Sequence, residues 1–579
     1  MTRLIPLAMS MALIVAACTS TVDESPTTTD AISVTATSSV VSATSTFPPP
    51  TTTSEPPDGF GGEVTIGTDF PIETLNPFAP NAFGVRTYGN LVWATVYDID
   101  PDTWDRIPDV IEAMPSKSGA ITVNDDGTMT VTYAIVNRAM WSDGEPITGF
   151  DLGFTAAAMR DMALAGEGGV DPVMATVVGT EADGKSASIT FSEPTLAFED
   201  AMWIILPSHV LEGVDLVNGT DGTDWPSGGP FVLDGAPDFN ELHFVRNENY
   251  WKSADGRALP YLDAVTILAT TEPGLQADEP VSPIGAFVAH VIDVAPIPPV
   301  PLLYDRIEDA VAEGAEFHYV PTPIIEHLTF NFSDVRLEAN PDSVNEFIDF
   351  RRALASSIDR PQILDETGVA WFPETPGMLI PLGESAWSVY EVGIAQIPEL
   401  PEGAASTLST TSNADERPKI AEALEPAFTA AGVTYEVDLQ DSQEFFQATI
   451  VDSTYDIGMW AWVSDGGYAR QLNMLGAFDP RSEPSDGNVR NWGSGGTAND
   501  ATVRFSEIID EARTTIDGAA FFDLVREAEA ILATELPIIP LFSRGTGLAI
   551  WPDAVSGVTH NGSRSEFTWN IETWQRVGE

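Results

Sequence analysis

Residues 455–467 read YDIGMWAWVSDGG, a short apolar and aromatic run that ends at an acid and two glycines. A run this short, rich in Ile, Val and Trp and closed by Ser-Asp-Gly-Gly, predicts a buried strand followed by a turn. Ligands of open α/β sheets bind outside the carboxyl ends of strands, which is where Asp465 falls. Trp460 and Trp462 lie two residues apart, so their side chains share one face and can form a wall of an apolar pocket. The same residues also fit a turn-stabilising acid above tryptophans that only fill a core, and the stretch alone leaves both interpretations open.

The composition is that of a large and strongly acidic globular protein. The chain has 579 residues, with 87 acidic against 26 basic side chains and a net charge of -61. This length is enough for three or four domains of ~150 residues and for a cleft between domains. The charge argues against nucleic-acid binding and against adsorption to anionic lipid, because both need clustered Lys and Arg. A single cysteine excludes an intramolecular disulfide and a zinc site built from cysteines.

The N-terminal segment has the order of a secretory signal. Arg3 precedes an apolar run over residues 4–15, and two alanines lead directly to Cys18. The apolar run is too short for a membrane-spanning helix, which needs ~20 residues. Val-Ala-Ala-Cys at residues 15–18 resembles the bacterial lipobox, which implies removal of residues 1–17, a lipid on Cys18 and export across the cytoplasmic membrane. A secretory signal without lipidation is the alternative.

Local patterns divide the rest of the chain. Residues 18–60 are dominated by Thr, Ser and Pro and predict a disordered tether. Folded sequence begins near Gly61, and alternating apolar residues predict two hairpins and a helix between them. The first hairpin is expected at 121–123 with 129–136, the helix at 148–162, and the second hairpin at 177–178 with 187–191.

The second half of the chain is richer in helical patterns. Residues 418–432 carry Ile420, Leu424, Phe428 and Ala431 on one stripe, with Pro426 expected to kink the helix. Amphipathic helices are predicted over 503–516 and 521–532, followed by a buried strand over 537–542. Alternating strands and helices with short connections indicate an α/β architecture.

The motif before the first predicted helix is distinctive. Trp141-Ser142-Asp143-Gly144, with Pro146, Thr148 and Asp151, resembles the signature of the family 5 extracellular solute-binding proteins, the oligopeptide- and dipeptide-binding receptors of bacterial ABC importers. Ten further segments agree with this family in the expected order. They are Leu75-Asn76-Pro77, Tyr97–Pro101, Gly228–Phe231, Asn247–Trp251, Pro260–Asp263, Leu328–Asn331, Arg351–Leu354, Ile358–Arg360, the stretch with Trp462 and Asp465, and Pro537–Phe542.

The resemblance covers the chain from Gly61 onward and implies its architecture. It implies an α/β fold of the large, class II periplasmic-binding-protein type, in which two lobes joined by crossing segments close over a solute. The implied division is a first lobe of residues 61–106, 227–300 and 537–579, an inserted subdomain of residues 107–226, and a second lobe of residues 301–536.

Catalytic motifs are absent from the sequence. It contains no Gly-x-Ser-x-Gly elbow, no phosphate loop with Gly-Lys-Ser/Thr and no His-Glu-x-x-His. The six histidines lack the spacing of metal ligands. We therefore expect no cofactor, no metal and no enzymatic activity. A secreted or surface-anchored hydrolase is the alternative class, because abundant acids could supply a carboxylate pair.

An acid beside indole rings suits an amino or other cationic group, because it pairs with the charge while the rings exclude water. In peptide-binding relatives the acid that matches Asp465 holds the peptide's α-ammonium, and the resemblance transfers that role here. A solvated loop is the alternative for Tyr468, and ordinary core packing is the alternative for Phe83 and Tyr88. The ligand-binding candidates are Asp465, Trp462, Trp460, Tyr468, Phe83 and Tyr88.

The chain departs from its peptide-binding relatives at Met459, where many carry an arginine for the peptide carboxylate. Some relatives bind sugars, nickel complexes or other solutes, and the sequence does not choose among them. The expected protein is a monomeric, lipid-anchored, extracytoplasmic receptor. It would deliver a small solute, peptide or cationic, to the permease subunits of an ABC importer.

Overall fold

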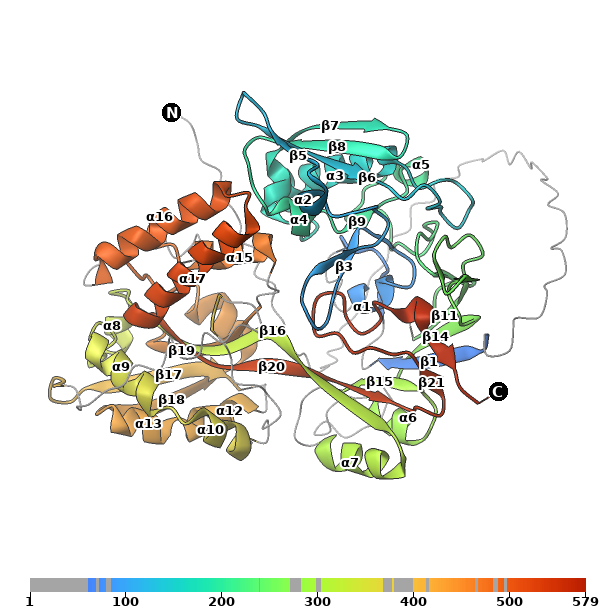
Figure 1. The fold of residues 1–579 in the computed structure, drawn as a ribbon. Helices are drawn as coiled ribbons and strands as arrows, with labels where there is room; N and C mark the ends of the chain where they lie inside the picture. Colours follow the sequence, from blue (N-terminus) through green and yellow to red (C-terminus); the bar gives the residue numbers. More distant parts are fainter. Residues whose placement is uncertain are drawn as a thin grey trace, which may run out of the picture.

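A 10-stranded mixed sheet runs through both halves of the molecule (Figure 1). The computed structural model describes residues 61–68, 72–79, 85–238, 240–270, 283–297, 303–367, 377–379, 399–412, 416–463, 467–482, 488–493 and 497–578. From one edge to the other, the strands are β10 (Phe231–Leu233), β11 (Glu241–Arg246), β14 (Ala264–Ala269), β1 (Glu63–Thr68), β15 (Val294–Ile297), β20 (Ile538–Ile550), β16 (Glu316–Phe330), β19 (Ile457–Val463), β17 (Ala405–Thr411) and β18 (Thr434–Gln440).

The two long strands β16 and β20 join the halves of this sheet. The first part of β16 pairs antiparallel with residues 545–550 of β20, and the end of β20 also pairs with β15. The second part of β16 pairs with β19, and the register of β16 against β20 shifts between Pro321 and Ile325. Each long strand therefore takes part in both halves, as the crossing ribbons of Figure 1 show.

Short connections and helices complete each half. In the first half, α6 (Ile284–Val288) and α7 (Tyr304–Glu313) share an apolar cluster with residues of β15 and β20. Among the described residues of the second half, the helices are α8 (Arg336–Ala339), α9 (Ile348–Ser357), α10 (Arg360–Thr367), α12 (Glu416–Ala423), α13 (Glu425–Ala430), α14 (Ser442–Glu444), η3 (Phe445–Thr449), α15 (Tyr468–Ala477), α16 (Asp500–Thr514) and α17 (Gly518–Glu535).

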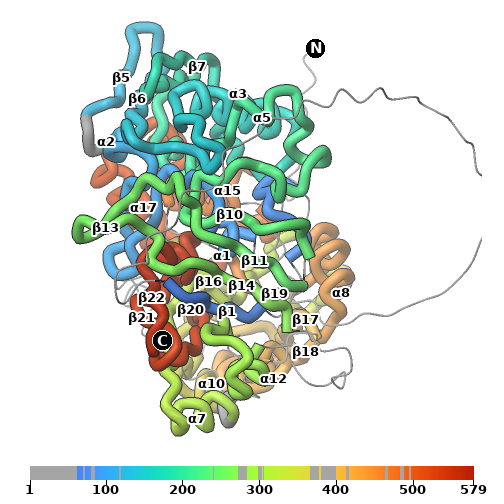
Figure 2. The backbone as a smooth tube through the Cα atoms, turned by 90° about the vertical axis from the view of Figure 1, so that its right-hand side faces the viewer, coloured from blue at the N-terminus to red at the C-terminus, as the bar shows by residue number. Residues whose placement is uncertain are grey.

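A separate four-stranded antiparallel sheet, of order β5-β6-β8-β7, lies at the top of the molecule in both views (Figures 1 and 2). Helix α3 packs on it, and Thr148 and Asp151 close the helix start as a capping box. Gly149 allows this close packing, because a Cβ there would lie 2.0 Å from the carbonyl oxygen of Ser186. The elements are β5 (Ile121–Val123), β6 (Met129–Ala134), α3 (Gly149–Ala165), β7 (Val177–Asp183) and β8 (Ser186–Phe191).

Short elements fill the connections around the first half and this small sheet. They are α1 (Val85–Gly89), β2 (Ala94–Thr95), β3 (Tyr97–Ile99), β4 (Arg106–Pro108), α2 (Pro115–Ser118), η1 (Pro172–Thr176), α4 (Phe198–Ala201), β9 (Ile204–Ile205), α5 (Ser208–Leu211), β12 (Ser253–Ala254), β13 (Arg257–Ala258), β21 (Val555–Ser556), η6 (Ile571–Thr573) and β22 (Gln575–Arg576).

Most local predictions are confirmed, and one is wrong in detail. Both hairpins, the helix after Thr148, helices α16 and α17 and the strand that becomes β20 are present where the patterns placed them. The single kinked helix expected over 418–432 is instead two helices, α12 and α13, separated at Leu424. Pro426 stands in the first turn of α13, where its missing N–H costs nothing, whereas inside a continuous helix it would clash with the preceding turn.

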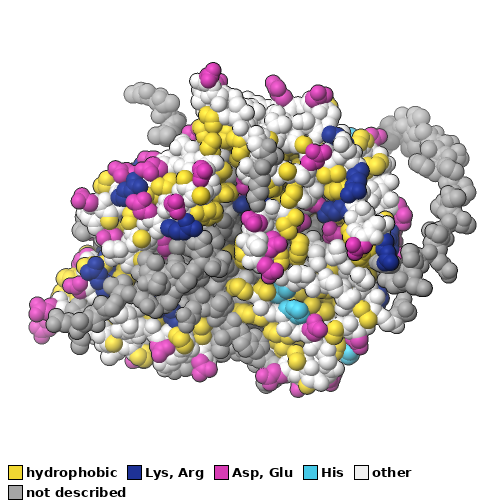
Figure 3. All heavy atoms as spheres, viewed as in Figure 1, with side chains coloured by type: hydrophobic (Ala, Val, Ile, Leu, Met, Phe, Trp, Pro, Cys, Tyr) yellow, Lys and Arg dark blue, Asp and Glu magenta, His cyan; other side chains and the backbone are white. Residues whose placement is uncertain are grey.

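Acidic side chains are distributed over both halves of the face seen in Figure 3 and do not form a single patch. This distribution fits a solvated acidic surface. In the part of the chain that the structure describes, no helix is both long and apolar enough to cross a bilayer.

Candidate functional site

Strand β19 contains residues 457–463 of the stretch 455–467 and lies in the middle of the second half of the sheet. It lies between β16 and β17, antiparallel to the first and parallel to the second. It ends at Val463, and the chain resumes at Gly467 as the N-cap of α15. Asp465 lies outside the described residues, but the two elements on either side of it are fixed. The predicted buried strand is confirmed, and the connection that follows it leads into a helix.

The two tryptophans of β19 share a face, as strand alternation predicts. Both rings contact His327 of β16, with ring centroids 5.1 Å from Trp460 and 6.5 Å from Trp462. Trp460 is 2% exposed and packs in a small aromatic cluster with Phe445 and Tyr455. Trp462 is only half-buried. Trp460 is therefore the base of this face, and Trp462 is the ring that extends toward the end of the strand.

His327 is a neutral member of this aromatic group. Burial, followed by the charge of Arg490, lowers the pKa of His327 to about 3. The imidazole is fully buried. It therefore provides packing for the tryptophans and no positive charge near neutral pH.

The start of α15 meets a charged group from the other half of the molecule. The Ala469 N–H donates a hydrogen bond to Oδ2 of Asp200, on α4, at 2.7 Å. The other carboxylate oxygen of Asp200 accepts a hydrogen bond from Arg106 of β4. Burial alone would lower the pKa of Arg106, but the negative charges around it, led by Asp200, raise the pKa above its usual value. Arg106 is therefore a permanent cation in this group.

Aromatic residues surround this ion pair on both sides. The guanidinium carbon of Arg106 lies 5.1 Å from the ring centroid of Tyr468, the first residue of α15. The Tyr97 hydroxyl donates to the carbonyl oxygen of Asp200 at 3.2 Å, and Arg564 donates to the same two groups at 3.2 and 3.3 Å. The start of α15 thus faces a polar surface built from β3, β4, α4 and the C-terminal segment.

The predicted site residues are only partly brought together. Tyr468 is half-buried against Phe521 and Phe522, and burial, followed by the charge of Glu199, raises the pKa of Tyr468 to about 12. Tyr88 lies elsewhere, in the apolar core of the first half, where it is 2% exposed. Phe83, like Asp465 and Cys18, lies outside the described residues.

Asp200 and Arg106 were missed by the sequence reasoning. They are separated by 94 residues, and Asp200 is 269 residues from Ala469. One sequence signal was available: Glu199 and Asp200 interrupt the apolar run LAFEDAMWIIL of residues 196–206, and both acids are buried. Two acids inside an apolar run need partners, because an unpaired buried charge is costly.

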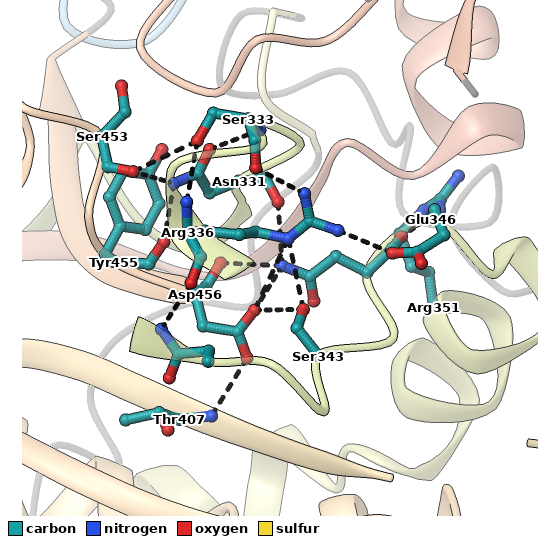
Figure 4. Close-up of polar contacts among 12 residues, drawn as sticks. Asn331, Ser333, Arg336, Ser343, Glu346, Arg351, Thr407, Ser453, Tyr455 and Asp456 are labelled. Atoms are coloured by element: carbon teal, nitrogen blue, oxygen red, sulfur yellow. Dashed lines mark hydrogen bonds and ion pairs between the residues drawn. The ribbon is translucent and has the colours of Figure 1, made fainter. Parts of the chain in front are cut away.

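A buried polar network fixes the other end of β19 (Figure 4). Asp456 is fully buried and accepts hydrogen bonds from Ser343 at 2.5 Å, from Asn345 at 2.9 Å and from the backbone N–H of Thr407 at 3.1 Å. Arg336 lies 3.9 Å away. These contacts tie β19 to β17 and to the segment that follows β16. Asp456 therefore positions the strand and does not face the site at its far end.

The buried carboxyl group of Asp456 should make the free energy of unfolding depend on pH. Burial, only partly offset by the Ser343 hydrogen bond, raises the pKa of Asp456 from 3.8 to about 6. Because the pKa is higher in the folded than in the unfolded protein, the protonated carboxyl group favours the folded state. Its contribution to the free energy of unfolding, about 3 kcal/mol, is fully present below the unfolded pKa and is lost as the pH rises through 6. Urea unfolding of the parent and of Asp456→Asn should therefore show that the parent loses about 2–3 kcal/mol relative to the variant between pH 4 and pH 7. Parallel profiles would contradict the assignment.

Comparison with known proteins identifies the family. The model described as bacterial extracellular solute-binding proteins, family 5 Middle, matches residues 107–479. The oligopeptide-binding protein OppA of Bacillus subtilis is 23% identical over 477 residues, which cover 74% of this chain and 79% of OppA. OppA of Mycobacterium bovis is 23% identical over 402 residues, which cover 63% of this chain and 62% of that protein.

Solved structures share the fold. The ABC transporter substrate-binding protein CtaP of Listeria monocytogenes matches with a TM-score of 0.67 and 19% identity, over 90% of this chain and 100% of CtaP. The oligopeptide-binding protein AppA of Bacillus subtilis, in complex with a nonapeptide, matches with a TM-score of 0.57 and 15% identity, over 90% and 100% of the two chains. NikZ of Campylobacter jejuni, in complex with Ni(L-His), matches with a TM-score of 0.60 and 16% identity, over 89% and 99%.

These matches confirm the α/β solute-binding fold expected from the sequence. The family model spans more than half of the 579 residues and includes the small sheet, both tryptophans and α15. The chain therefore belongs to the bacterial extracellular solute-binding proteins of family 5.

Proposed function

We propose that this protein captures a peptide or another small solute between its two halves and delivers it to the permease of an ABC importer. The observation that carries the proposal is the family match over residues 107–479, on a fold whose halves are joined by β16 and β20. Family 5 members are binding receptors and not enzymes, so the hydrolase alternative is set aside.

The two lobes of the proposal follow the division expected from the sequence. The first lobe comprises residues 61–106, 227–300 and 537–579, the inserted subdomain residues 107–226, and the second lobe residues 301–536. Helix α7 packs with α6 in the core of the first half, however. We therefore place the passage into the second lobe within β16 and not at residue 301.

The proposed solute site lies at the end of β19. Asp465 is the proposed partner of a cationic group, and Trp462, above Trp460, forms the apolar wall beside it. Tyr468 follows at the start of α15. On the first lobe, Phe83 and Tyr88, in the segment before β2, remain proposed residues of the solute site. Tyr88 is buried in the core, which favours a supporting role for it.

The chemistry of the solute is proposed from the relatives. AppA binds a nonapeptide, and NikZ binds Ni(L-His). Both solutes contain amino acids, which carry amino and carboxylate groups. Met459, at the position where many peptide-binding relatives carry an arginine, is fully buried in the apolar core. A residue at another position would therefore have to bind a carboxylate of the solute.

We further propose that the protein works outside the cytoplasm on a lipid anchor. Residues 1–17 would be the signal, Cys18 the lipidated residue and residues 18–60 the tether. All three lie outside the described residues. The lipobox resemblance and the family's extracellular location support this arrangement.

Ligand-induced thermal stabilisation tests the proposed function. The purified protein is incubated with a library of peptides, amino acids and their metal complexes, and unfolding is followed by tryptophan fluorescence. A solute at 100 times its dissociation constant should stabilise the protein by about 2.7 kcal/mol, and mass spectrometry should recover it unchanged. Conversion of a compound to a product, or no stabilisation by any class of solute, would contradict the proposal.

A further inference from the structure

A hydrogen bond connects the inserted subdomain to helix α15 of the second half, close in sequence to the proposed solute site. Asp200 belongs to α4, which packs beside η1 in the upper part of the molecule, whereas Ala469 belongs to α15 of the second half (Figure 1). The 2.7 Å contact between the Asp200 carboxylate and the Ala469 N–H is buried. It places a negative charge at the start of a 10-residue helix, where free N–H groups and the helix dipole favour an anion.

The Asp200 carboxylate is held ready for this contact. Its second oxygen is paired with Arg106, and its backbone carbonyl accepts hydrogen bonds from Tyr97 and Arg564. Asp200 is 3% exposed. Arg106 also lies over the ring of Tyr468, so both members of the ion pair contact α15.

Gly467 shows how closely the two halves approach. A Cβ at this position would lie 2.6 Å from three atoms of the Asp200 carboxyl group. Real Cβ atoms essentially never make contacts under 3.0 Å, so a larger residue at this position requires the carboxylate and the helix start to separate. The backbone of Gly467 is in an ordinary extended conformation, with φ of -78°. Glycine is therefore needed here for space and not for its backbone freedom.

We propose that Asp200 is a latch that holds the two lobes together in the absence of solute. The inference rests on the proposed two-lobe receptor and adds to it a contact that the protein makes with itself. The hydrogen bond to Ala469 and the approach of Arg106 to Tyr468 exist only when the lobes are close. Their free energy therefore favours the closed form before any solute arrives. A solute that binds the closed form therefore has to supply less free energy to close the lobes.

Two substitutions test the latch from opposite sides. Asp200→Ala removes the carboxylate, and Gly467→Ala keeps Asp200 and Arg106 but blocks the approach of the carboxylate to α15. Gly476→Ala is the matched control, because a Cβ at that glycine of the same helix meets nothing within 4 Å. Small-angle X-ray scattering of each solute-free protein measures closure, and circular dichroism confirms that each variant is folded.

Both latch variants should shift the solute-free scattering to a larger radius of gyration, while Gly476→Ala should match the parent. Hydrogen exchange at the Ala469 amide should be at least tenfold faster in both latch variants than in the control. A folded Gly467→Ala with the parent's scattering and exchange would overturn the proposal, whatever Asp200→Ala does. The measurement needs no solute, so its failure is distinct from a failure to find a ligand.

Discussion

Replacing Glu326 with glutamine is expected to lower the free energy of unfolding by about 3–5 kcal/mol. Glu326 is fully buried on β16 and accepts hydrogen bonds from Arg417 of α12 at 2.9 Å and from Arg544 of β20 at 2.9 Å. Removing one member of a buried ionic group costs more than the group contributes, because the remaining charges stay buried without their counter-ion. After the substitution Arg544 keeps its ion pair with Glu416, while Arg417 keeps only a neutral hydrogen-bond acceptor, the hydroxyl of Thr411, among its described contacts.

The pKa of Glu326 shows that the carboxylate is charged in the folded protein. Burial alone would raise this pKa, but Arg417 and Arg544 outweigh burial and lower the pKa from 4.5 to about 2. A lowered native pKa gives stability that is present above the unfolded value and is lost as pH falls through 2. The loss caused by Glu326→Gln should therefore be largest near neutral pH and shrink in acid.

An exposed ion pair provides the control for Glu326. Glu507 lies 3.4 Å from Arg504 on α16, with its side chain 59% exposed. Exposed pairs of this kind contribute about 0–1 kcal/mol, so Glu507→Gln should leave the unfolding midpoint nearly unchanged. Both variants are measured by urea unfolding at pH 7. Equal midpoints for the two variants would mean that the ionic group beside the crossing strands does not stabilise the fold.

Local patterns predicted the elements, because burial repeats along a strand or helix with a fixed period. Trp460 and Trp462 share a face for this reason, and the stripe Ile420, Leu424, Phe428 and Ala431 is fully buried as expected. The break at Leu424 was missed, since a proline inside an apolar stripe is compatible with either a kink or a new helix start. Which of the two forms depends on how the helices pack against the sheet.

The site is less predictable than the elements, because its parts come from distant segments. The pattern of residues 455–467 predicted β19 and the connection that carries Asp465, because the two form one continuous segment of sequence. Asp200 reaches α15 only through the packing of the inserted subdomain against the second half. Tyr88 follows an early family motif, yet its side chain packs in the core of the first half. The period of the hydrophobic pattern does not indicate which side of a connection faces the other lobe.

Replacing Asp465 with alanine is expected to raise the dissociation constant of a cationic solute by about 30-fold or more. Both ends of the connection that carries Asp465 are held: Val463 pairs with Ile324 of β16, and Ala469 bonds to Asp200. In the proposed site the carboxylate would pair with the positive group of the solute beside Trp462, so the substitution would remove a charge-assisted hydrogen bond. Truncating one partner of such a pair costs about 2–5 kcal/mol, which corresponds to this change in affinity.

Two further variants make the Asp465 measurement specific. Asp465→Asn keeps the size of the side chain and removes its charge, so its affinity for a cationic solute should fall nearly as far as that of Asp465→Ala. Asp452→Ala removes an exposed acid before the other end of β19 and should leave the affinity unchanged. Calorimetric titration with the solute found by thermal stabilisation measures all three. If Asp465→Ala binds a cationic solute as tightly as the parent does, the acid at the end of β19 is a turn residue and the positive group of the solute is bound elsewhere.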